Sequence, residues 1–341
     1  MIGALHSRLF QASAAAALVV IILGLGYLGT RGQPLTRTFP LEKLSIAIPT
    51  VPHAALLYIA AAKGYFAEEG LEVTMIPTIH GKAAIDLVLQ GNADLGAASE
   101  VVFVLATTTG GALGIAANMF SSSNDLAVIA RRDHGIAAPH DLAGKKIGVT
   151  LGTAGEYFLW AFLIRHKLPP GSVTLVDMPP GQIAPGIVAG TIDATSTWQP
   201  NGLNAQLALS DNAVTFYEPQ SYTETVNVIG RSDFLKGHSK AIEKLVRAIL
   251  KAEQFNLAQP EEALNLVAAS LKIDVDALRP TWKRFDFRVN LLQSHLITLE
   301  DEARWAMARG YAEKGPVPNF LPHLYLDALL AVQPERVTVL H

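Results

Sequence analysis

The feature that most constrains the fold of this chain is a short phrase that occurs twice. Residues 91–100 read GNADLGAASE, and residues 190–199 read GTIDATSTWQ. Each phrase starts with glycine, has an aspartate at its fourth position and continues with small and hydroxyl residues. Asp94 and Asp193 lie 99 positions apart. We therefore expect two similar structural units.

The segments around each phrase repeat one order of elements, in which strands alternate with helices. Parallel strands need a crossover of helical length, so this order predicts an α/β fold with mainly parallel sheets. In the first unit we expect strands at 44–50, 71–77 and 93–99, with helices in 51–70 and 81–91. In the second we expect strands at 145–151, 172–179 and 192–198, with helices in 152–166 and 181–190.

Two such units predict a cleft. In open α/β sheets, ligands bind beyond the carboxyl ends of the strands, so two lobes that face each other at those ends would enclose a ligand. The repeated aspartates themselves have a simpler explanation, because an Asp shortly after a helix-ending glycine commonly hydrogen-bonds backbone. We expect Asp94 and Asp193 to shape turns and not to contact the ligand.

The N-terminal region differs from the rest of the chain. The run Leu9–Leu28 contains no charged residue. About 20 apolar residues suffice to span a bilayer as a helix. Gly24 and Gly26 offer a small-residue cleavage site, so both an uncleaved signal anchor and a cleaved signal peptide stay open. Either one exports the chain to the periplasm or another extracytoplasmic space, and we place residues 1–40 outside the fold.

Charge and composition exclude several classes of partner and cofactor. The chain has 27 Lys plus Arg against 30 Asp plus Glu, a net charge of -3, so we expect no nucleic-acid partner. It has no cysteine, which excludes disulfides, zinc-thiolate sites and iron-sulfur clusters. The ten histidines show no i,i+4 pair on a helix and no H-E-x-x-H. We therefore expect no metal site, no cofactor and no catalytic residue.

Several segments resemble the periplasmic substrate-binding proteins of ABC importers, in the branch for sulfonates, taurine, nitrate and thiamine-pyrimidine precursors. The similarity covers roughly residues 42–310. The segments that carry it are AAAKGYFAEEGLEV (60–73), GNADLGAAS (91–99), DLAGKKIGV (141–149), GTAGEYFL (152–159), GTIDATSTWQP (190–200) and NVIGRSDFL (227–235).

The resemblance implies a type II periplasmic-binding-protein fold whose two lobes close on a small molecule. It also implies delivery of that molecule to an ABC permease and its ATPase, and we expect a monomer. In this family the chain passes twice between the lobes, and we place the passages near Leu126–His134 and Tyr222–Gly230. Lobe one then takes residues 41–128 and 231–341, and lobe two takes residues 129–230.

The candidate ligand-binding residues follow the predicted strands or lie near the predicted passages. Acids among them would favour an organic ligand that bears a nitrogen donor, whereas a sulfonate would favour basic residues such as Lys82 or Arg131. A flat ring would stack on Trp198. The candidates are Pro52, His53, His80, Ser99, Glu100, Gly152, Thr153, Glu156, Trp198, Gln199, Tyr222 and Glu224.

Two other functions stay open. The first is an enzyme on the same two-lobed fold, such as a lyase or dehydratase, against which the export segment argues. A fungal-type thiamine-pyrimidine synthase depends on a cysteine-rich motif that this chain lacks. The second is a membrane-tethered sensor that presents its ligand state to a partner receptor.

Overall fold

The computed structural model describes residues 41–219 and 221–340. The described residues belong to one compact unit that begins at Leu41. The predicted export segment, residues 9–28, lies outside the described part of the chain. Within that part, no helix has the length and apolar character needed to cross a membrane.

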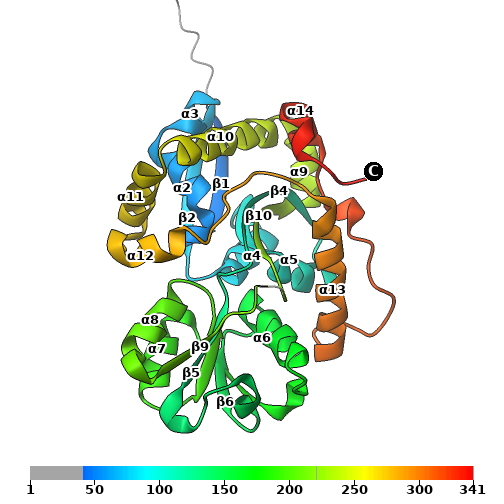
Figure 1. Cartoon of the computed structure of the whole chain (residues 1–341). Helices are drawn as coiled ribbons and strands as arrows, with labels where there is room; N and C mark the ends of the chain where they lie inside the picture. Colours follow the sequence, from blue (N-terminus) through cyan, green and yellow to red (C-terminus); the bar gives the residue numbers. More distant parts are fainter. Residues whose placement is uncertain (1–40, 220, 341) are drawn as a thin grey trace, which may run out of the picture. The chain divides into compact units, whose positions relative to one another are not determined.

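The unit contains two five-stranded sheets, one in each lobe (Figure 1). In the first sheet the order is β2-β1-β3-β10-β4, and β10 runs antiparallel to both of its neighbours. Its strands are β1 (Glu42–Pro49), β2 (Leu71–Thr78), β3 (Leu95–Ser99), β4 (Leu113–Ser122) and β10 (Glu224–Arg231).

The second sheet repeats this plan with the order β7-β6-β8-β5-β9, in which β5 is the antiparallel strand. Its strands are β5 (Ala127–Arg131), β6 (Lys146–Val149), β7 (Thr174–Asp177), β8 (Ala194–Thr197) and β9 (Ala213–Phe216). The predicted duplication and the α/β class are therefore confirmed. Each sheet also holds an antiparallel strand that the local pattern did not predict.

The strand pairing places the two passages between the lobes at other positions along the chain than predicted. β5 begins at Ala127 and pairs only within the second sheet, and β10 pairs within the first sheet from Glu224 onward. The chain therefore passes between the sheets at 123–126 and 217–223, not at 126–134 and 222–230 as predicted. The prediction failed because residues 127–131 and 224–231 are largely buried strands that complete sheets and are not linkers.

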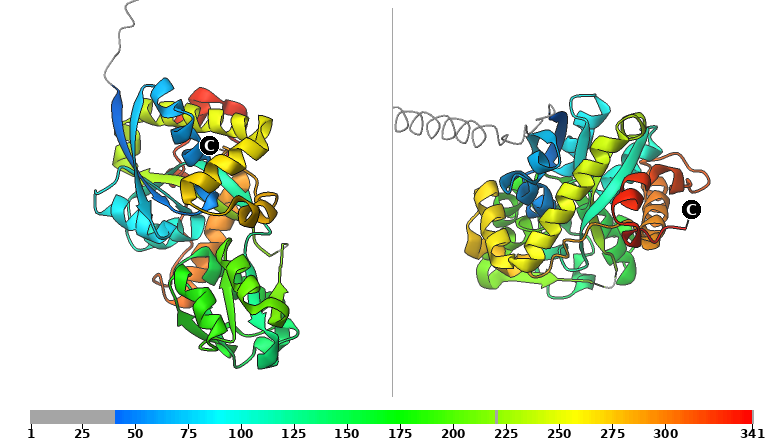
Figure 2. Two further views of the ribbon diagram at one scale, coloured as in Figure 1. Left: turned by 90° about the vertical axis from the view of Figure 1, so that its left-hand side faces the viewer. Right: turned by 90° about the horizontal axis from the view of Figure 1, so that it is seen from above.

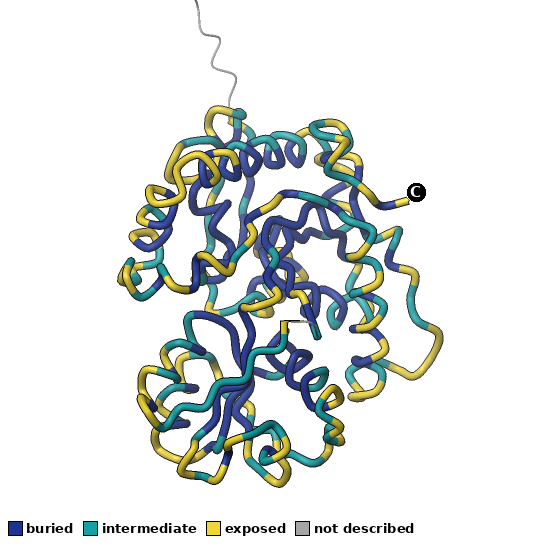
Figure 3. Tube along the Cα trace, viewed as in Figure 1, coloured by how far each residue is buried: buried dark blue, intermediate teal, exposed yellow. Residues whose placement is uncertain are grey.

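Helices cover both sheets, and their exposed faces lie outward while the strands are mostly buried (Figures 2 and 3). With the first sheet lie η1 (Pro52–Ala54), α2 (Ala55–Ala62), α3 (Tyr65–Glu68), α4 (Gly81–Leu89), α5 (Glu100–Thr108), α9 (Ser232–Gly237), α10 (Ser239–Ala258), α11 (Pro260–Leu271), α12 (Val275–Trp282) and α14 (Asp327–Val332). With the second lie α6 (Ala154–Arg165), α7 (Pro180–Val188) and α8 (Asn201–Leu209).

The long helix α13 (Gln293–Arg309) joins the two lobes. It packs on α5, yet its Trp305 and Ala306 belong to the apolar core of the second lobe. Arg309, its last residue, bonds Glu156 of α6 at 2.9 Å. We predicted that the C-terminal segment 231–341 belongs to the first lobe alone. The contacts of α13 with the second lobe correct this prediction.

The repeated glycine and aspartate have the same structural roles in both lobes, the glycine after a helix and the aspartate as an acceptor for a strand N–H. Gly91 and Gly190 follow α4 and α7 with φ of 76° and 71°, a left-handed conformation that favours glycine. Asp94 accepts a hydrogen bond from the backbone N–H of Ser45 at 2.8 Å, and Asp193 accepts one from that of Lys146 at 2.7 Å. Each aspartate thus fastens the end of its turn to the neighbouring strand, which agrees with the predicted structural role.

Candidate ligand-binding site

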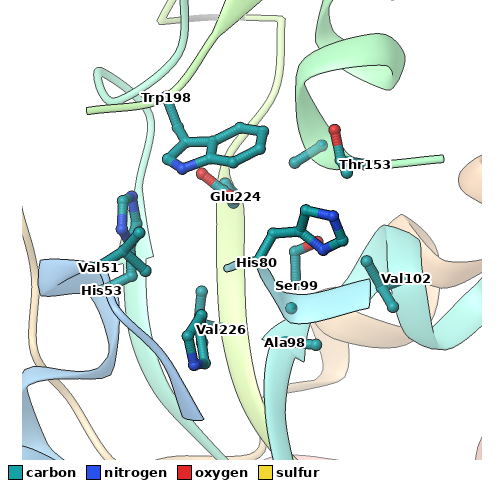
Figure 4. Close-up of a pocket in the computed structure, with 13 residues that line it drawn as sticks. Val51, His53, His80, Ala98, Ser99, Val102, Thr153, Trp198, Glu224 and Val226 are labelled. Carbon is teal, nitrogen blue, oxygen red and sulfur yellow. The ribbon is translucent and has the colours of Figure 1, made fainter. Parts of the chain in front are cut away.

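A small pocket of about 40 Å³ lies where the carboxyl ends of the parallel strands of both sheets meet (Figure 4). Side chains after β1, β2 and β3 form one wall, side chains after β6 and β8 form the other, and β10 crosses behind them. The pocket is lined by Pro49, Val51, His53, His80, Gly81, Ala98, Ser99, Val102, Thr153, Ala154, Trp198, Glu224 and Val226. This is the place that the strand order predicts for a ligand.

Glu224, the first residue of β10, is the acid of this pocket. It is 4% exposed, and its Oε2 has no hydrogen-bond partner among the described residues. Burial raises the pKa of Glu224 well above its usual range, and the negative charges of Asp125 and Glu100 add to the rise. A buried carboxyl oxygen without a donor is costly, so this atom is suited to accept a hydrogen bond from a ligand.

His53 lies beside Glu224 in the pocket lining and is held by Asp125. Its Nε2 is 2.8 Å from Oδ2 of Asp125, and both side chains are buried. The imidazole also packs edge-on against Phe120, with ring centroids 4.7 Å apart. Asp125 lies in the passage 123–126 and was not among the predicted site residues, because only the fold brings it to His53.

His80, which follows β2, supplies a hydrogen-bond donor to the pocket. As the N-cap of α4, its Nδ1 accepts the backbone N–H of Ala83 at 3.1 Å. Burial, and then the nearby positive charge of Lys82, hold the pKa of His80 below its usual value. A neutral ring whose Nδ1 accepts carries its proton on Nε2, so His80 can donate from that atom.

Trp198 supplies the apolar surface of the pocket. It directly follows β8, is 7% exposed and belongs to the apolar core of the second lobe while also lining the pocket. In Figure 4 the indole extends into the same space as the carboxyl group of Glu224. A flat ligand ring would find a face to stack on here.

The structure brings six of the twelve predicted site residues together in this pocket. They come from both lobes, as a closing cleft requires. These six are His53, His80, Ser99, Thr153, Trp198 and Glu224.

Glu100 and Tyr222 lie in the protein interior and not in the pocket lining. Tyr222 donates to Glu100 through its hydroxyl, and Glu100 also accepts from the backbone N–H of Thr225 at 2.9 Å. Burial raises the pKa of Glu100 to about 7. The sequence correctly placed Glu100 directly after a strand but could not show that its carboxylate turns towards β10.

The carboxylate of Glu156 also has its hydrogen-bond partners within the protein. It accepts from the backbone N–H of Gly152 at 2.8 Å, from the Tyr311 hydroxyl at 2.8 Å and from Arg309. Thr153 is the N-cap residue of α6, but its side chain forms no capping hydrogen bond, because its hydroxyl donates to the carbonyl of Thr150 at 2.6 Å. Of the three acids among the predicted site residues, Glu100, Glu156 and Glu224, the pocket lining contains Glu224.

The remaining three candidates also lie outside the pocket lining. Pro52 is buried at the start of η1. Gln199 uses its side chain to accept the backbone N–H of Leu203 at 2.9 Å. Gly152 lines a neighbouring groove of about 620 Å³ that shares His80 and Val102 with the pocket.

A protein-family model described as NMT1/THI5 like matches residues 51–263, which is more than half of the chain and includes most of the pocket lining. The chain belongs to the NMT1/THI5-like family. The resemblance inferred from the sequence segments is thereby confirmed.

Curated relatives of this NMT1/THI5-like protein include binding proteins and an enzyme. A putative binding protein of Brucella abortus is 26% identical over 63% of this chain and 67% of its own length. The formylaminopyrimidine-binding protein of Halalkalibacterium halodurans is 24% identical over 67% of this chain and 70% of its own length. A 4-amino-5-hydroxymethyl-2-methylpyrimidine phosphate synthase of Saccharomyces cerevisiae is 24% identical over 84% of this chain and 87% of its own length.

Solved structures confirm the fold. The periplasmic aliphatic sulphonate binding protein of Escherichia coli matches with a TM-score of 0.72 at 12% identity, over 84% of this chain and 98% of the other. The periplasmic nitrate-binding protein of Synechocystis matches with a TM-score of 0.72 at 14% identity, over 86% and 89%. At these identities the likeness establishes the two-lobed periplasmic-binding-protein fold and not the ligand.

Proposed function

We propose that this protein is an extracytoplasmic solute-binding protein that delivers a small organic ligand to an ABC importer. The ligand would carry an N–H donor on a flat ring. The observation that carries this proposal is Oε2 of Glu224, a buried acceptor without a partner in a pocket formed by both lobes. The family membership and the binding-protein relatives support the transport role.

The chemistry of the pocket lining favours nitrogen over an inorganic anion. None of the lining residues that the structure describes is Lys or Arg, whereas recognition of a sulfonate or nitrate commonly uses such cations. Lys82 lies in the neighbouring groove, and Arg131 bonds Asp133 at 2.7 Å. An amino group would donate to Glu224, and a ring acceptor would receive the Nε2 proton of His80.

Transport would work by closure. A ligand that contacts Trp198 from one lobe and His80 from the other stabilises the closed form over the open form, since it binds only the closed form on both sides. The closed form would then dock on a permease. Whether a segment at 9–28 tethers the protein to the membrane is part of this proposal and is tested by finding it in washed membranes or in the soluble extract.

A thermal-shift panel on the purified protein tests the ligand class. The panel contains aminopyrimidines, taurine, alkanesulfonates, nitrate and polyamines. A ligand at a hundred times its Kd adds about 2.7 kcal/mol to the free energy of unfolding, so a true ligand raises the Tm clearly. We expect aminopyrimidines to do so and Glu224→Gln to remove the effect, with exposed Glu72→Gln as the matched control. A shift with sulfonates or nitrate alone would overturn the ligand assignment.

One observation favours an enzyme as the second candidate. His53 is oriented by a buried carboxylate, an arrangement also used by general bases. The yeast synthase covers more of this chain than the binding proteins do, although the cysteine-rich motif of that enzyme class is absent. Conversion of a bound ligand during incubation, lost in His53→Gln, would favour the enzyme; recovery of the unchanged ligand would favour transport.

A further inference from the structure

Three side chains from distant parts of the sequence meet at the wall of the pocket. They are His53 of η1, Asp125 of the passage 123–126 and Glu224 at the start of β10. One ligand-type atom of each residue lies within 4.8 Å of the other two, and all three residues are buried.

The hydrogen bonds of this cluster leave acceptor atoms without donors. Asp125 accepts from Nε2 of His53 at 2.8 Å and from the backbone N–H of Gln199 at 3.3 Å. Oε2 of Glu224 and Nδ1 of His53 have no partner within the described residues. Two buried carboxyl groups this close need a proton or a cation between them, because like charges in a medium of low polarisability repel strongly.

No protein cation fills this need. The ion pairs of Asp125 and Glu224 in the described part of the chain include no Lys or Arg, and His53 is the one nitrogen side chain paired with Asp125. A divalent ion would balance the two carboxylate charges and would use the lone pair that Glu224 leaves free.

The donor set indicates which ion fits. One imidazole nitrogen with two carboxylate oxygens is a mixed set that zinc accepts, with three protein ligands and one open position. Calcium and magnesium prefer six or more oxygen ligands, which this buried cluster does not provide. We propose that His53, Asp125 and Glu224 bind a zinc-class divalent ion at the wall of the ligand pocket.

Such an ion would change what the pocket recognises. His53 and Glu224 line the pocket, so the ion would lie at its edge and neutralise the carboxylate of Glu224. The pocket would then offer an open coordination position on the ion where the metal-free form offers an acceptor. The metal-free protein would prefer an N–H donor, and the zinc-loaded protein would prefer a ligand with a lone pair or a negative charge.

Isothermal titration of the full chain with zinc chloride tests this inference. The protein carries no histidine tag, because a tag would itself bind zinc, and it is treated with EDTA and then dialysed. We expect one zinc per chain, with no measurable binding of calcium or magnesium. Glu224→Gln and Asp125→Asn should each weaken zinc binding at least tenfold.

His134→Ala provides the matched control. His134 forms another close histidine-aspartate contact, 2.6 Å to Asp193, but it is partly exposed and has no third ligand among the described residues. We expect this variant to bind zinc like the parent. If Asp125→Asn fails to fold, Glu224→Gln and His53→Gln, checked by circular dichroism, carry the test.

Two results would overturn the inference: no saturable zinc binding, or zinc binding that survives in Glu224→Gln and His53→Gln. The outcome is independent of the proposed transport function, because zinc is titrated without an organic ligand. Aminopyrimidine binding in EDTA with no zinc binding would leave the transport proposal intact and remove the metal site. If the protein binds zinc but none of the organic compounds in the panel, the metal site stands and the transport proposal fails.

Discussion

The two lobes share a glycine and an aspartate that shape equivalent turns, and they differ in the residues that face the pocket. Asp94 and Asp193 each hold a neighbouring strand. Five positions later the lobes diverge, because Ser99 of the first corresponds to Trp198 of the second. Both Ser99 and Trp198 line the pocket. Repeated residues therefore maintain the architecture, and the places where the repeat fails supply the surface of the pocket.

The next pair of positions extends this comparison. Glu100 and Gln199 also lie 99 positions apart, and each helps to hold one passage between the lobes. Glu100 accepts from Tyr222 and Thr225 at the second passage. The backbone N–H of Gln199 donates to Asp125 in the first passage. Equivalent residues thus secure opposite connections, and they do so with a side chain in one lobe and the backbone in the other.

Replacing Glu100 with Ala should give the largest effect. The change leaves the buried donors of Tyr222 and Thr225 without an acceptor and opens a cavity, so we expect a loss of about 3 kcal/mol in the free energy of unfolding. Gln199→Ala keeps the backbone bond to Asp125 and loses the bond to the Leu203 N–H, which should cost about 1 kcal/mol. Urea denaturation measures both values. Equal losses would remove the asymmetry between the two connections.

The repeated aspartates should give matched losses. Asp94→Ala and Asp193→Ala each remove a charged acceptor from a strand N–H, so we expect each to lower the free energy of unfolding by about 2 kcal/mol. Ligand affinity of the folded variants should stay within a factor of about two, since neither residue lines the pocket. A large loss of affinity in one variant alone would show that the repeat is not purely structural.

The pocket walls should respond differently to truncation. Trp198→Ala removes the proposed stacking surface and should weaken binding of an aminopyrimidine at least tenfold, or about 1.4 kcal/mol. Ser99→Ala on the other wall should cost less. Titration calorimetry compares them, with Trp160→Ala as the control, because Trp160 lies on α6 and does not line this pocket. Unchanged affinity in a folded Trp198→Ala protein would mean that Trp198 packs in the core of the second lobe and does not contact the ligand.

The sequence predicted the repeated architecture well because glycine, aspartate and strand patterns are local signals. It predicted six residues of the pocket from one rule, that ligands lie beyond the carboxyl ends of parallel strands. It missed Asp125 and assigned the carboxylate of Glu100 to the cleft, because both depend on the antiparallel strands, which pair with partners far along the chain. The anchoring of Glu156 by Arg309 spans 153 positions, and no local pattern reports it.

The smallest effect that we predict is a pH dependence that belongs to the first lobe. Burial raises the pKa of Glu100 to about 7, so the folded protein keeps a proton that the unfolded chain releases near its usual pKa of 4.5. The free energy of unfolding should therefore fall as the pH rises between these values, by about 1 kcal/mol from pH 6 to pH 7. Below pH 4.5 both states hold the proton, and well above pH 7 both have lost it, so this contribution becomes constant.

Glu100→Gln isolates this contribution, because the amide fills nearly the same space and does not titrate. Urea denaturation at pH 6 and pH 7 should show a smaller difference for this variant than for the parent, while exposed Glu72→Gln should behave like the parent. Gln199, the equivalent residue of the second lobe, already carries an amide. The same pH dependence in the parent and in Glu100→Gln would mean that the proton resides on another buried carboxyl group, with Glu302 the first to be tested, since burial and the charge of Glu100 raise its pKa as well.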